Sequence, residues 1–132
     1  MTELELQAQV ADYIRLKYPS VIFHSDFGSG IKLTMGQAIR QKRLNGGRRS
    51  WPDMLLAEPR GDYHALFIEL KREGTRIFKK DGALVADEHI REQFDMLHDL
   101  RRKGYAAEFG IGFDATKKLI DDYMKGRYAH AD

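Results

Sequence analysis

The 132-residue sequence contains no cysteine, which excludes disulfide bonds and metal sites built on thiolates. It also lacks an apolar run near the ~20 residues that a membrane-spanning helix needs, and its start shows no signal-peptide pattern. The net charge is only +2, so bulk charge does not by itself indicate a nucleic-acid partner. We therefore expect a soluble protein of a reducing cytoplasm.

The composition is that of one globular domain with one core, because 42% of the residues are hydrophobic and 32% are charged. The sequence shows no internal repeat or low-complexity tract. Its histidines have no metal-ligand spacing, so a zinc site is not expected; they are His24, His64, His89, His98 and His130.

Two apolar runs, residues 51–56 and 63–71, are joined by a turn-rich link at residues 58–62. This pattern predicts two buried strands that pair as a hairpin. Because strand side chains alternate between faces, Glu69 and Lys71 should lie on one face, roughly 7 Å apart at their Cα atoms. Asp53 opens the partner strand and should come near them.

Two carboxylates and one ammonium at the end of an apolar hairpin are costly unless they pair or hold a cation. Asp53 and Glu69 offer the hard oxygen ligands that Mg²⁺ or Mn²⁺ prefers, and Lys71 could position an attacking water or stabilise charge on a phosphate. A salt bridge between Glu69 and Lys71 is the alternative interpretation. The Pro52-Asp53 pair on the neighbouring strand favours the metal site.

Hydrophobic periodicity and capping signals predict the remaining elements. An amphipathic helix should cover residues 3–17, with Thr2 as N-cap and Glu5 completing a capping box. Gln93 should lie on or beside the inward stripe of another helix, where a polar amide needs partners. The other expected strands are a short one at 21–24 and one at 105–113. The other expected helices are 35–44, 88–103 and 115–125, the last opened by Asp114, and a frayed tail is expected at 126–132.

A basic segment leads directly into the acidic pair. Residues 27–52 contain six basic side chains and no acidic one, and a second basic loop follows Lys71. Beside a metal site, such segments suit contacts to a phosphate backbone, although an ordinary solvated loop has the same composition. The candidate nucleic-acid-binding residues are Lys32, Arg40, Lys42, Arg43, Arg48, Arg49, Arg72, Lys79 and Lys80.

One motif spacing in the sequence resembles the PD-(D/E)XK nuclease superfamily: Pro52-Asp53 is followed, after fifteen residues, by Glu69-Leu70-Lys71. The order of the other motifs resembles its VRR-NUC branch, in particular small stand-alone bacterial and phage members. The resemblance implies an α/β, restriction-endonuclease-like core with a mixed β-sheet flanked by helices, over residues 1–126, followed by a tail at 127–132. The sequence departs from the family pattern at residues 109–112, which are Phe-Gly-Ile-Gly where the family has a Val-Arg-Arg-like element.

The resemblance also implies roles for particular residues. Asp53 and Glu69 match the metal-binding acids, and Lys71 matches the catalytic lysine. Gln93 matches a glutamine that supports the site, and Glu3 matches an acid of the first helix, a role for which Glu5 competes. The implied metal set is Asp53, Glu69 and Leu70, with Mg²⁺ or Mn²⁺ as cofactor.

The expected activity is metal-dependent hydrolysis of phosphodiester bonds in DNA. Stand-alone relatives are similar to Holliday-junction resolvases, so the substrate is expected to be branched or four-way DNA and the protein a homodimer. A flap or single-strand nuclease is the alternative enzyme, and a nucleic-acid-binding module with a structural acid pair is the alternative without catalysis.

Overall fold

The computed structural model describes residues 1–26, 33–48 and 50–131. Over these residues helices and strands are mixed, as the predicted α/β class requires. In chain order they are α1 (Glu3–Lys17), β1 (Phe23–Ser25), α2 (Met35–Leu44), β2 (Met54–Leu56), β3 (Leu66–Lys71), α3 (Glu88–Arg102), β4 (Ala106–Ile111) and α4 (Phe113–Met124). No helix in this described part is long and apolar enough to cross a membrane.

The strands form one mixed sheet in the order β1-β2-β3-β4. β2 pairs antiparallel with β1 and with β3, so the predicted hairpin is confirmed. β4 instead lies parallel to β3, because the chain crosses over through α3 between the two strands. The strands are shorter than the apolar runs: Tyr63 lies outside β3 and forms an isolated bridge with Arg60.

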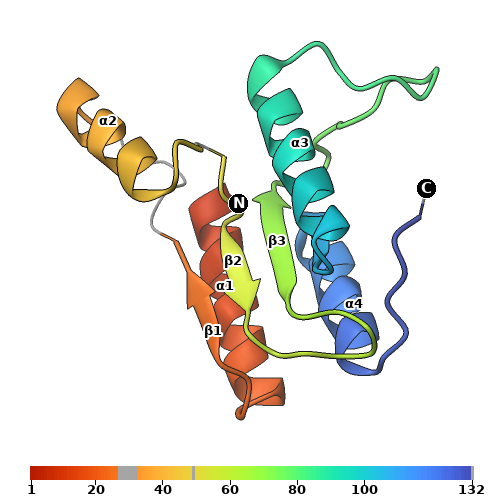
Figure 1. The fold of residues 1–132 in the computed structure, drawn as a ribbon. Coiled ribbons are helices and arrows are strands. Elements are labelled where there is room, and N and C mark those ends of the chain that lie inside the picture. The colour runs from red at the N-terminus through yellow and green to blue at the C-terminus, as the bar shows by residue number, and fades with distance from the viewer. Residues whose placement is uncertain (27–32, 49, 132) are drawn as a thin grey trace.

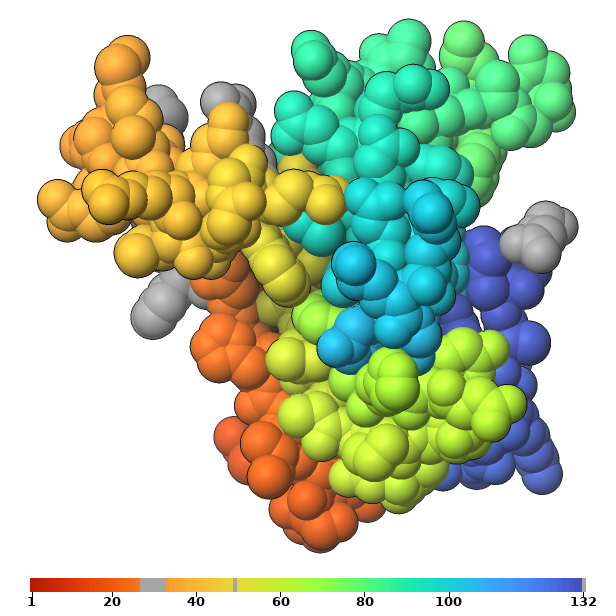
Figure 2. All heavy atoms as spheres, in the orientation of Figure 1, coloured from red at the N-terminus to blue at the C-terminus, as the bar shows by residue number. Residues whose placement is uncertain are grey.

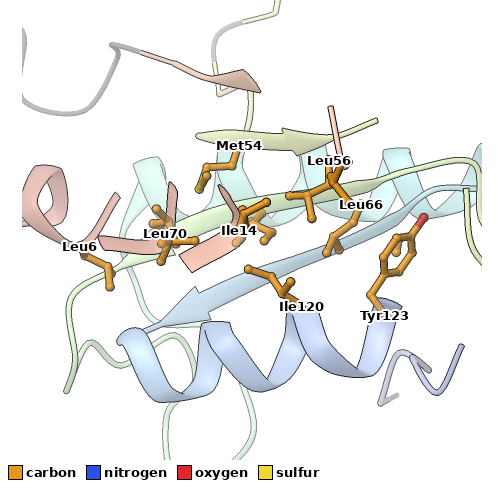
Figure 3. Packing of buried hydrophobic residues seen from close by; sticks show 12 residues of the cluster. Leu6, Ile14, Met54, Leu56, Leu66, Leu70, Ile120 and Tyr123 are labelled. Carbon is orange, nitrogen blue, oxygen red and sulfur yellow. The ribbon is translucent and has the colours of Figure 1, made fainter. Parts of the chain in front are cut away.

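The helices cover both faces of the sheet (Figure 1). On one face, buried residues of α1 and α4 pack on alternate residues of β3, namely Leu66, Ile68 and Leu70. Figure 3 shows Leu66 and Leu70 of β3 packed among Leu6 and Ile14 of α1 and Ile120 of α4. On the other face, α3 packs on Phe67 and Ala107. This alternation confirms the predicted faces of the second strand and directs Glu69 and Lys71 toward the α3 side.

Local capping chemistry explains where the helices begin. Thr2 and Glu5 form the predicted capping box of α1, and Thr34 forms another with Gln37 at α2. Asp87 caps α3 by accepting a hydrogen bond from the backbone N–H of Ile90. The prediction that Asp114 opens the last helix is wrong: α4 begins at Phe113, with Gly112 as N-cap at φ 80° and no side-chain cap.

The prediction of a frayed tail is also wrong for Tyr128. Its ring packs edge-on against Tyr63, at 4.9 Å between ring centroids, and against Tyr123. Its hydroxyl donates a hydrogen bond to Glu108 of β4, and His130 Nδ1 lies 2.7 Å from the same carboxylate. Aromatic packing and a half-buried carboxylate acceptor therefore hold the segment against the fold.

α2 differs from the other helices because none of its residues is buried. It lies apart from the sheet in Figure 1 and forms a separate lobe in Figure 2. Its exposed side chains include the apolar residues Met35, Ile39 and Leu44. The sequence predicts its boundaries from the Thr34 cap and the Asn45-Gly46-Gly47 stop, but not this separation from the core.

Candidate active site

The β2–β3 register brings the two motif acids together. Met54 pairs with Ile68, so Asp53, one residue earlier, lies beside Glu69, one residue later. Both side chains are buried, with 7% and 4% of their surface exposed. Asp53 Oδ2 accepts a 2.8 Å hydrogen bond from the backbone N–H of Leu70. This bond fixes the Asp53 carboxylate against the end of β3.

Lys71 shares the face of Glu69, and it is also buried, with 7% exposed. Burial raises the pKa of the Glu69 carboxyl to about 10, and both a hydrogen bond to Asp53 and its negative charge act in the same direction. The charge of Lys71 lowers this pKa, and that of Glu3 raises it further. The structure therefore brings Glu3, Asp53 and Lys71 within electrostatic reach of Glu69.

α1 contributes two polar side chains to this end of the sheet. Glu3 is half-buried and lines a groove beside Asp53 and Glu69, whereas Glu5 is exposed and occupied in the capping box. The geometry thus places Glu3 rather than Glu5 at the site. Gln7 is buried, and its Nε2 donates to the backbone carbonyls of Asp26 at 2.7 Å and Asp53 at 3.5 Å.

Gln93 lies on α3 near the acids, and only 5% of it is exposed. Its Nε2 lies 3.1 Å from Nε2 of His89, one helical turn earlier. Its Oε1 is buried without a hydrogen-bond partner in the described part of the protein. Gln7 and His89 were not predicted as site residues; the sequence signal for both was their i, i+4 spacing from Glu3 and Gln93.

A groove of about 860 Å³ lies between the first turns of α1 and α3 and the α2 arm, which we define as residues 33–48. Of the groups described above it is lined by Glu3, Asp53, Glu69, His89 and Gln93, and not by Gln7 or Lys71. Its walls differ in charge. The α3 side carries Glu88 and Glu92, and the α2 side carries Lys42 and Arg48. Other side chains that line it include Asp26, Asn45, Ser50 and Trp51.

The predicted nucleic-acid-binding residues do not all meet at this groove. Lys42 and Arg48 line it, and Arg48 also forms an ion pair with Asp99 at 3.2 Å. The others described are exposed, on α2 or on the connection from β3 to α3, and do not line it: Arg40, Arg43, Arg72, Lys79 and Lys80. Lys32 and Arg49 lie outside the described residues.

The available ligands suit a Mg²⁺ site with few protein ligands better than a site in which the protein supplies every ligand. Within residues 1–26, 33–48 and 50–131, no group of three or more His, Cys, Asp or Glu side chains is placed to hold a metal. Mg²⁺ commonly takes only one or two carboxylates and keeps several waters or substrate oxygens. Asp53 and Glu69 could supply the carboxylates, and Leu70 could contribute only its backbone carbonyl. The pKa of Glu69 is raised first by burial and then by the neighbouring Asp53, so a bound cation would favour its ionised form.

Structural comparison yields a close match in fold. A solved structure described as a VRR_NUC domain protein aligns over 95% of this chain and 89% of its own, with a TM-score of 0.70 and 24% sequence identity. This chain has the VRR_NUC fold. The predicted restriction-endonuclease-like architecture is thereby confirmed. No family model matches the sequence, and no curated protein gives a significant match.

Proposed function

We propose that this chain is a VRR-NUC-type nuclease that hydrolyses phosphodiester bonds in DNA with Mg²⁺ or Mn²⁺. The observation that carries the proposal is the buried set Asp53, Glu69 and Lys71, whose two acids line a groove, in a chain with the VRR_NUC fold. Surface ion pairs do not require such burial, so a salt bridge between Glu69 and Lys71 is the weaker interpretation.

Each residue has a distinct task in the proposed reaction. Asp53 and Glu69, with the carbonyl of Leu70, would hold the ion, which when bound lowers the pKa of water and stabilises charge on the phosphate. Lys71 orients or activates the attacking water, or stabilises the charge that develops on the phosphate. Gln7 supports Asp53 through the backbone, and Gln93 and Glu3 complete the polar wall.

Substrate positioning falls to the basic side of the groove. Lys42 and Arg48 are placed to contact phosphates close to the acids, whereas Arg40 and Arg43 extend the basic surface along α2. Contacts of this kind hold the phosphate backbone of the DNA without reading its base sequence. This arrangement supports recognition of DNA structure rather than of a specific site.

We further propose that the substrate is a four-way or otherwise branched DNA, that the acting form is a homodimer, and that it works in the cytoplasm. Two symmetric cuts in a four-way junction require two sites related by twofold symmetry. The exposed apolar residues of α2 support a second copy as partner, and residues 27–50 could exchange between protomers. Light scattering at micromolar concentration tests the proposed homodimer, and a monomeric mass would refute it.

The decisive experiment is cleavage of labelled four-way junction, flap, single-stranded and duplex DNA with Mg²⁺ or Mn²⁺. We expect paired nicks on the junction, lost in Asp53→Ala and in Lys71→Ala. Asp62→Ala and Lys118→Ala are matched controls, because both residues are exposed and lie outside the groove. Cleavage of flaps or single strands alone would support the alternative nuclease. Binding without metal-dependent cleavage would refute the enzyme and favour the binding module.

A further inference from the structure

The two ends of the Gln93 side-chain amide have different surroundings. Its Nε2 contacts His89, whereas its Oε1 is buried and unpartnered among the described residues. Leaving a buried amide oxygen without a donor is unfavourable, so native structures usually satisfy it. Gln93 lines the same groove as Asp53 and Glu69, so a donor that enters this groove with the substrate could satisfy the buried oxygen.

The contact with His89 determines which end of the amide is free. The Gln93 amide nitrogen can only donate, so His89 Nε2 must accept, and the neutral ring then carries its proton on Nδ1. If Nε2 of His89 donated instead, the amide would have to turn. Its NH₂ group would then occupy the position of the free oxygen, where it could not accept a hydrogen bond from water.

We propose that His89 is a positioning residue that holds the Gln93 amide with its oxygen available to the catalytic site, where it accepts a hydrogen bond from the attacking water. This inference rests on the proposed nuclease function. His89 itself is exposed on the first turn of α3 and lines the groove. Its replacement should therefore change the orientation of the amide without removing core packing.

The kinetic test uses three replacements of His89 in the full-length protein, at pH 8 with Mn²⁺ and the DNA that the wild type cleaves best. His89→Gln keeps an acceptor, so we expect kcat near the wild-type value. His89→Ala removes one neutral hydrogen bond, so kcat should fall by about 2- to 10-fold with little change in KM. His89→Lys offers only donors and should lower kcat at least as far.

Matched controls come from the same helix. His98 is exposed and does not line the groove, so His98→Ala and His98→Lys report any general effect of losing an imidazole or adding a charge. We expect both to cleave like the wild type. The proposal would be overturned if His89→Ala matched the wild type, or if His89→Gln were as impaired as His89→Ala.

A spectroscopic test does not depend on cleavage. In long-range ¹H–¹⁵N spectra at pH 8, His89 should show the neutral tautomer protonated on Nδ1. The Gln93 side-chain amide signal should shift in His89→Ala and stay in place in His98→Ala. A His89 ring protonated on Nε2 would refute the positioning role. If the wild type cleaves no DNA, the nuclease proposal fails, while these spectra still decide how the amide is held.

Discussion

Replacing Glu69 with glutamine should make the metal-free protein more stable at neutral pH. Burial, together with Asp53, raises the pKa of this carboxyl to about 10 in the folded state, from an ordinary value of 4.5. The folded protein therefore holds Glu69 protonated at pH 7.5, whereas the unfolded chain releases the proton. Because the folded pKa is raised, the stabilisation is fully present below pH 4.5 and is lost as the pH rises toward 10.

The expected size of the effect follows from the width of this pH window. Each pH unit between the two pKa values is worth about 1.4 kcal/mol, so raising the pH from about 5 to about 7.5 should remove about 3 kcal/mol from the free energy of unfolding. Glutamine has a similar shape and does not titrate, so Glu69→Gln escapes this loss. With an unfolding entropy of about 2.1 cal/mol/K per residue, the difference corresponds to a Tm about 10 °C higher.

Thermal unfolding in EDTA at the two pH values measures this difference. We expect Glu69→Gln to exceed the wild type at pH 7.5 and to match it near pH 4.5. Glu88→Gln is the control, because Glu88 lines the same groove but is exposed. The reasoning would be refuted if Glu69→Gln gained the same stability over the wild type at both pH values, or if it were less stable than the wild type at pH 7.5.

Adding Mn²⁺ should remove most of the difference between the two proteins. Metal binding requires the ionised carboxylate, so it should stabilise the wild type, by about 2.7 kcal/mol when the free ion is 100 times its Kd. Glu69→Gln lacks one of the two carboxylates and should gain far less. Equal stabilisation of both proteins by Mn²⁺ would show that Glu69 does not hold the ion.

Two further predictions concern the scaffold. Gly110→Ala should lower the free energy of unfolding by about 1–3 kcal/mol, because its Cβ would lie 2.5 Å from Thr116 Oγ1. Gly36→Ala, with open space around it, should instead raise the free energy of unfolding by about 0.5–1 kcal/mol. Urea unfolding of both variants measures these two changes. Tyr128→Ala should destabilise by about 1–3 kcal/mol through loss of its ring contacts and its bond to Glu108, and a Tm equal to that of the wild type would contradict the packed tail.

The hairpin and its acids could be predicted because the relevant physics is local. Alternation along residues 66–71 determines which side chains share a face, and the turn before it brings Asp53 alongside. The first turns of α1, α2 and α3 were predictable for the same reason, since Thr2, Thr34 and Asp87 each cap a backbone N–H three residues away.

What could not be predicted depends on contacts across the chain. Gln7 reaches the carbonyl of Asp53, 46 residues later, and no local pattern specifies that bond. The tail looked frayed because it lacks periodicity, yet Tyr128 finds a ring partner in Tyr63. The start of α4 was misplaced because Gly112, where the chain leaves β4, ends the strand and begins the helix without a capping side chain.

The crossover from β3 through α3 to β4 has a consequence for synthesis. The ribosome makes Asp53 and Glu69 well before Gln93 and before β4, the parallel neighbour of β3. At about 5–20 residues per second, several seconds pass between translation of the acids and translation of the elements that flank them. Pairing of β3 with β4 closes a loop of long sequence separation, which is a slow event in folding. A nascent chain of this protein therefore cannot complete the sheet around β3 until β4 has left the exit tunnel.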